Sequence, residues 1–127
     1  MQENHLFEYA VIRVVPKVER EEFFNVGVIL YCAQQNFLQT LYMVDANRLP
    51  AFCNKMDIEE LREHLNAFEK VCIGDPGGGP IGKLPIAERF RWLTATRSTI
   101  VQTSKVHPGL CDDAQDMILH LYAQLVL

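Results

Sequence analysis

Residues 89–110 carry side chains that can hold an anion or a flat ring. Arg89, Arg91 and Arg97 can each bind a phosphate or a carboxylate through two parallel N–H donors. Trp92 offers a surface on which a ring can stack. Further polar side chains that can complete such contacts follow at Ser98, Thr99, Gln102 and His107. The stretch therefore predicts a surface that binds an anionic group of a partner.

Charge distinguishes this part of the chain from the rest. Residues 83–110 contain five basic residues and one acidic residue, whereas the whole chain has a net charge of −4. A basic segment in an acidic chain can mark a surface that faces an anion. In the alternative interpretation, the arginines pair with surplus acids such as Glu21 and Glu22, and Trp92 belongs to the core. The sequence leaves both interpretations open.

Catalytic and metal-binding patterns are weaker. Ser98, His107 and a carboxylate can be nominated as nucleophile, base and orienter, but nothing in their spacing requires them to meet. The four histidines are scattered, and no Cys-x-x-Cys pair occurs, so we expect no metal site and no cofactor. Cys111 is expected to open a helix, where a thiolate would be favoured, although simple packing is the alternative.

Residues 74–85 form a Gly/Pro-rich loop by composition. Within it, residues 77–83 fit G-x-x-x-x-G-K, the opening of a phosphate-binding P-loop. However, Leu84 stands where the motif requires Ser or Thr, Pro85 follows where a helix should continue, and the preceding segment predicts a helix instead of a strand. We therefore interpret the segment as a loop, one that can close over a site.

Hydrophobic patterns predict an α+β fold. The expected strands cover residues 7–15, 23–32, 37–44 and 97–106, and the expected helices cover 57–72, 85–93 and a final segment capped by Asp112 or Asp113. The short early connections predict a three-strand N-terminal meander, so we expect a four-stranded, mainly antiparallel sheet with helices packed mainly on one face. Gly27 indicates a bulge or a close backbone approach, and residues 107–109 indicate a turn.

Length and composition bound the protein class. The 127 residues, 49% of them hydrophobic, predict a single folded domain over 1–127. The acidic balance argues against general nucleic-acid binding, so a nucleic-acid partner is only weakly supported. The N-terminus has no signal-peptide pattern, and no apolar run is long enough to span a membrane, so we expect a cytoplasmic protein.

Two long segments resemble a known family. YAVIRVVPKVEREEFFNVGVILYC at residues 9–32 and PIGKLPIAERFRWLTATRSTIVQTSKVHPGLC at residues 80–111 closely resemble the uncharacterised bacterial family called domain of unknown function 3037. The resemblance implies no established activity. It implies a protein partner, because members are often encoded beside genes for HipA-like kinases. The matching pattern residues are Arg13, Pro16, Glu21, Phe24, Asn25, Gly27, Arg89, Phe90, Trp92, Arg97, Ser98, His107 and Pro108.

These observations favour a non-catalytic cytoplasmic binding or adaptor domain. Its expected surface combines the arginines and polar residues of 89–107 with Arg13 and Asn25, and its partner is a protein such as a HipA-like kinase or a phosphorylated small ligand. One alternative is a regulator of such a kinase. Another is a small enzyme for a phosphorylated or nucleotide substrate, with the Gly-rich loop as lid and Ser98 or His107 in the chemistry. The oligomeric state stays open.

Overall fold

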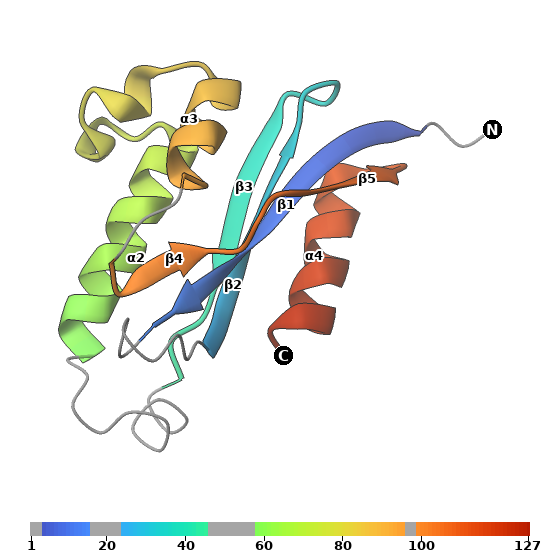
Figure 1. The fold of residues 1–127 in the computed structure, drawn as a ribbon. Helices are drawn as coiled ribbons and strands as arrows, with labels where there is room; N and C mark the ends of the chain where they lie inside the picture. The colour runs from blue at the N-terminus through green and yellow to red at the C-terminus, as the bar shows by residue number, and fades with distance from the viewer. Residues whose placement is uncertain (1–3, 16–23, 46–57, 96–98) are drawn as a thin grey trace.

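The computed structural model describes residues 4–15, 24–45, 58–95 and 99–127 and has the predicted α+β fold (Figure 1). The strands are β1 (His5–Val14), β2 (Phe24–Cys32), β3 (Phe37–Tyr42), β4 (Val101–Thr103) and β5 (His107–Cys111). The helices are α2 (Ile58–Ile73), α3 (Ile86–Leu93) and α4 (Ala114–Leu125), with two short 3-10 turns at Pro76–Gly78 and Ile81–Lys83.

β1 is the centre of an antiparallel sheet. It pairs with β2 along one side, and β3 continues the sheet beyond β2 as the predicted meander. Along its other side, β4 pairs with the C-terminal part of β1 and β5 pairs with the N-terminal part. The described residues thus form five strands, one more than the sequence predicted.

The additional strand, β5, follows the predicted fourth strand and occupies the segment that was predicted to form a turn. Residues 107–109 form no turn, because the chain stays on β1 through Ser104, whose hydroxyl oxygen accepts from the Val11 N–H at 2.9 Å. The Ser104 N–H donates in return to the Val11 carbonyl at 2.8 Å. After this irregularity the chain pairs with β1 again, and Pro108 is tolerated because β5 lies at an edge of the sheet.

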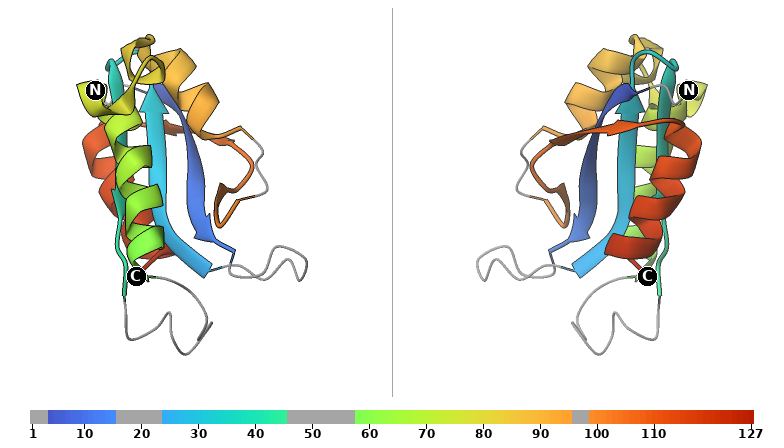
Figure 2. Two further views of the ribbon diagram at one scale, coloured as in Figure 1. Left: turned by 90° about the vertical axis from the view of Figure 1, so that its left-hand side faces the viewer. Right: turned by 90° about the vertical axis from the view of Figure 1, so that its right-hand side faces the viewer.

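Helices cover both faces of the sheet (Figure 2). α2 and α3 share one face, where Leu61, Leu65 and Phe90 pack with Ile12 and Ile29. α4 covers the opposite face. Its apolar residues Ala114, Ile118 and Leu121 pack there with Phe7, Val28, Leu30 and Cys32. Two of these three helices lie on one face, as predicted, whereas the predicted final helix, α4, covers the opposite face, which explains why successive residues of β2 are buried.

A β-bulge interrupts the pairing of β1 with β2. Ile12 lies opposite Gly27, whereas the next residue, Arg13, lies opposite Asn25, so Val26 is the extra residue. Gly27 also fulfils the second prediction, close backbone approach, because a Cβ atom there would collide with the backbone of β3 at Leu41 and Tyr42. The bulge decides which side chain stands beside Arg13.

The Gly-rich loop is ordered by the end of α2. Gly74 adopts φ +76°, and the N–H groups of Gly74 and Asp75 donate to the Val71 and Lys70 carbonyls, which is the usual glycine-dependent helix ending. The Asp75 carboxylate then accepts from the Gly77 N–H at 2.7 Å. A helix precedes the loop where a P-loop needs a strand, so this structure gives the motif no phosphate-binding context.

Within the residues described here, no helix has the length and apolar character needed to cross a membrane. The predicted cap of α2 at Asp57 falls outside the described residues. The cap of α4 is confirmed at Asp113, whose carboxylate accepts from the Asp116 N–H.

Candidate functional site

Three of the predicted site residues form one row across the sheet. Arg13 on β1 lies directly opposite Asn25 on β2 and directly opposite Gln102 on β4. Residues directly opposite in antiparallel strands point to the same face, with Cβ atoms about 5 Å apart. The row Asn25–Arg13–Gln102, hereafter the Arg13 row, therefore presents one guanidinium between two amides on the sheet face that carries α4.

The β-bulge creates this row. With regular pairing and no bulge, Val26 would stand opposite Arg13 in place of Asn25. Bulges occur often next to functional sites, because they redirect a side chain without ending the strand. The bulge thus exchanges an apolar neighbour of Arg13 for an amide.

Both amides are fixed by backbone contacts. The Asn25 side-chain N–H donates to the Leu125 carbonyl at the end of α4, at 3.3 Å. The Gln102 side-chain N–H donates to the Thr99 carbonyl at 2.9 Å. The Asn25 Oδ1 atom is buried and accepts no hydrogen bond within the described part of the chain. The row therefore offers a positive charge and a buried acceptor side by side.

An aromatic pair continues the same face. His107 on β5 lies opposite Tyr9 on β1, and the two rings contact each other with centroids 5.4 Å apart. Tyr9 stands four residues before Arg13 in one strand, so both side chains point to the α4 side. The sequence prediction missed Tyr9, although strand alternation from Arg13 would have identified it.

Arg89 has a structural position. Its guanidinium lies against Gly74 at the C-terminal end of α2, so closely that a Cβ atom on Gly74 would collide with Nη1. A cation is favoured there because the free carbonyls of a helix end carry partial negative charge. Burial raises the pKa of the neighbouring Cys72 thiol to about 12, although the Arg89 charge acts against this rise. We assign Arg89 to the packing of α3 on α2.

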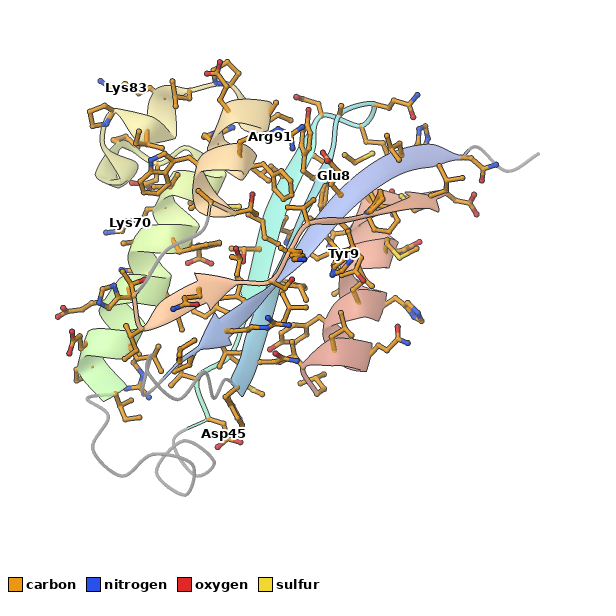
Figure 3. All side chains as sticks on the ribbon, viewed as in Figure 1. Glu8, Tyr9, Asp45, Lys70, Lys83 and Arg91 are labelled. Atoms are coloured by element: carbon orange, nitrogen blue, oxygen red, sulfur yellow. The ribbon has the colours of Figure 1, made fainter. Side chains whose placement is uncertain are left out.

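Arg91 points away from Arg89, toward the sheet. Its Nη1 lies 3.4 Å from a carboxylate oxygen of Glu8 on β1, and Figure 3 shows the two side chains on the same side of the sheet. The Arg91 side chain is 64% exposed, so the pair contributes about 0–1 kcal/mol to stability. The basic segment is thus dispersed, since Arg89 lies against Gly74, Arg91 lies beside Glu8, and Lys83 lies apart from Arg91 in the Gly-rich loop (Figure 3).

Trp92 and Thr99 line a separate apolar cleft between α2, α3 and β4. The cleft has a volume of about 220 Å³, and its other walls come from His64, Ala67, Phe68, Val71, Leu93 and Val101. Trp92 is 43% exposed, so it is a wall of this cleft and not a core residue. The cleft lies on the opposite face from the Arg13 row.

The remaining predicted residues fall into three cases. Arg97 and Ser98, like Glu21 and Glu22, lie outside the described residues. The Gly-rich loop packs on α2 and α3, whereas His107 points to the α4 face, so the loop does not cover His107. Cys111 ends β5 and does not open a helix. Its thiol is buried beside Cys32, and burial raises its pKa, so a thiolate is disfavoured there.

Metal-binding side chains are dispersed in the described segments, where no three His, Cys, Asp or Glu residues gather closely enough to hold an ion.

Comparison with known proteins identifies the family. No curated protein and no solved structure matches the chain. A family model described as protein of unknown function (DUF3037) matches residues 9–126, which include every residue of the Arg13 row, of the Tyr9–His107 pair and of the Trp92 cleft. The chain therefore belongs to the family of unknown function DUF3037.

Proposed function

We propose that the protein is a non-catalytic binding domain that holds an acidic segment of a protein partner on the Arg13 row. The observation that carries this proposal is the register that aligns Asn25, Arg13 and Gln102 on one sheet face. A guanidinium held between two fixed amides is a suitable partner for a carboxylate, because its planar donors match the two oxygens of that group.

Partial burial strengthens this interaction. Arg13 is only partly exposed, whereas the Arg91 side chain is 64% exposed. A charge pair near a protein surface with restricted water is several times stronger than the same pair in bulk water. The Arg13 row is therefore a better anion site than the more exposed Arg91.

The buried Asn25 Oδ1 atom favours a peptide over a free anion. It needs a hydrogen-bond donor, and leaving such an atom without one costs about 1–3 kcal/mol. A peptide carries a backbone N–H next to an acidic side chain, so it can supply the donor to Asn25 and the carboxylate to Arg13 together. A phosphate dianion supplies oxygens but no donor.

The proposal is tested by partner capture with matched variants. Tagged full-length protein is incubated with lysate of its own cells, and captured proteins are identified by mass spectrometry, a HipA-like kinase being the first class to look for. We expect Arg13→Gln to lose the partner and the matched variant Arg91→Gln to retain it, with both variants folded by circular dichroism. Equal capture by Arg13→Gln and wild type would contradict the site assignment.

A further inference from the structure

The two edges of the sheet differ in accessibility. At the β3 edge, Thr40 in the middle of the strand is only 5% exposed, because α2 and α4 pack against both sides of β3. At the other edge, Leu110 in β5 is 61% exposed, and β5 pairs only with β1 within the described residues. An uncovered edge strand is a template for another strand. The β5 edge is therefore the more exposed edge of the sheet.

The backbone hydrogen bonds of β1 show which backbone groups of β5 point outward. Val15 donates to Ile100 and Val11 accepts from Ser104, so the odd-numbered residues of β1 direct their backbone groups toward β4 and β5. Because ladder bonds alternate, the β5 residues opposite them bond inward, whereas Pro108 and Leu110 direct their backbone groups to the outer edge. Within the described part of the chain, the backbone groups left without a partner on this side are the Pro108 carbonyl and the N–H and carbonyl of Leu110.

We propose that this edge binds the same edge of a second copy of the chain, with the two β5 strands antiparallel about a two-fold axis at Leu110. In this register Leu110 exchanges two hydrogen bonds with its symmetry mate. The Asp112 N–H, for which no bond is found in the described part of the chain, donates to the Pro108 carbonyl of the second copy. Closed two-fold pairing of identical surfaces is the commonest form of protein oligomer.

The backbone donors and acceptors of the two strands match in this register. Pro108 has no N–H, so the carbonyl of Asp112 would find no donor in the second copy. That carbonyl is already satisfied, because the Gln35 side chain donates to it at 3.2 Å. The register therefore leaves none of these backbone groups unpaired, which a buried strand pair requires.

Side chains and charges are also self-complementary. Leu6 lies opposite Leu110 within one chain, and both are exposed, so the pairing joins four leucines into one apolar row across the extended sheet. Basic Lys105 and His107 stand before or at the start of β5, whereas acidic Asp112 and Asp113 follow its end. Antiparallel pairing places His107 opposite Asp113 of the second copy, so unlike groups meet.

The test is the mass of the full chain in solution. Light scattering after size-exclusion chromatography should give twice the 14.6 kDa of one chain at high concentration, with dissociation on dilution. Leu110→Lys places two cations face to face and should give a monomer. Leu119→Lys is the matched control, because Leu119 is a similarly exposed leucine on α4 and should leave the dimer intact.

Several results would overturn the proposal. The proposal is wrong if the wild-type chain is monomeric at every soluble concentration. It is equally wrong if the monomeric chain binds an extended peptide at this edge instead of a second copy. A dimer that survives Leu110→Lys but not Leu119→Lys would also overturn it. If Leu110→Lys does not fold, the pairing is tested instead by amide hydrogen exchange of the wild type at several protein concentrations. The Leu110 and Asp112 amides must exchange more slowly as the concentration rises, and exchange independent of concentration refutes the pairing.

Discussion

Ser104 gives the sharpest test of how the sheet positions the site. Its hydroxyl accepts from the Val11 N–H at 2.9 Å and donates to the Lys105 carbonyl at 2.9 Å, at the point where β4 ends and β5 has not begun. Ser104 is 7% exposed and its bond to Val11 is buried, so water cannot replace that bond. This single side chain keeps Gln102 and His107 on the same face of β1.

Ser104→Ala should lower the free energy of unfolding by about 2–4 kcal/mol. The Val11 N–H would remain buried without an acceptor, which costs about 1–3 kcal/mol, and the second hydrogen bond contributes about 1 kcal/mol more. For a domain of this size the expected fall in melting temperature is about 8–16 °C.

Urea unfolding followed by circular dichroism measures this change. The matched control is Gln102→Ala, two residues away on the more exposed side, which should cost about 0.5 kcal/mol or less. A loss below about 0.5 kcal/mol for Ser104→Ala would refute the reasoning, because it would mean that the Val11 N–H finds another partner without the hydroxyl.

Three further predictions concern the ends of the helices and a buried thiol. Gly74→Ala should cost about 1–2 kcal/mol in urea unfolding, because the residue has φ +76° and its Cβ would displace the Arg89 guanidinium; an unchanged midpoint would contradict this. Gln35→Ala should cost about 1 kcal/mol, because Gln35 Oε1 accepts from the Ala114 N–H at 2.7 Å and so caps α4; unchanged stability would show that this contact is dispensable. Burial raises the Cys72 pKa from 9.0 to about 12, so the folded state favours the protonated thiol. This stabilisation is complete below the unfolded pKa and is lost as pH rises from 9.0 toward about 12, so Cys72→Ala should show a shallower loss of stability than wild type over that window.

The main elements were predictable because their signals are local. Helix α2 shows apolar residues at three- and four-residue spacing, and Leu61, Leu65 and Phe68 are indeed buried. The turn at residues 33–36 has a polar sequence, and Asn36 takes a left-handed φ of 49° there. Such patterns depend on near neighbours in the chain, so a single sequence contains them.

β5 was mistaken for a turn because Pro108 and Gly109 are residues typical of turns. Their strand conformation depends on tertiary structure: Pro108 lies at an open edge, and Gly109 leaves room for the Phe7 ring, which a Cβ atom would contact at 2.6 Å. Similarly, the thiol of Cys111 is buried against the α4 face, so its predicted place at a helix start was wrong. These contacts join residues about a hundred positions apart, and no local pattern encodes them.

The sequence could predict which residues belong to the candidate site, but not which of them lie side by side. Arg13, Asn25 and Gln102 were all predicted to belong to the binding surface, yet their alignment depends on the bulge at Val26. Conversely, the sequence grouped Arg89 with Arg91, whereas α3 directs the first toward Gly74 and the second toward Glu8. Sequence spacing shows charge density, but helix geometry decides which direction each charge faces.

The most direct test of the binding proposal is an amide chemical-shift titration of the full chain with a short acidic peptide and, separately, with inorganic phosphate. We expect saturable shifts at Arg13, Asn25 and Gln102 with the peptide, weaker shifts with phosphate, and loss of both in Arg13→Gln. Peptide shifts that centre on Arg91 or on the Trp92 cleft, or shifts that persist in Arg13→Gln, would contradict it. Stronger shifts with phosphate than with the peptide would likewise refute the role given to the Asn25 acceptor.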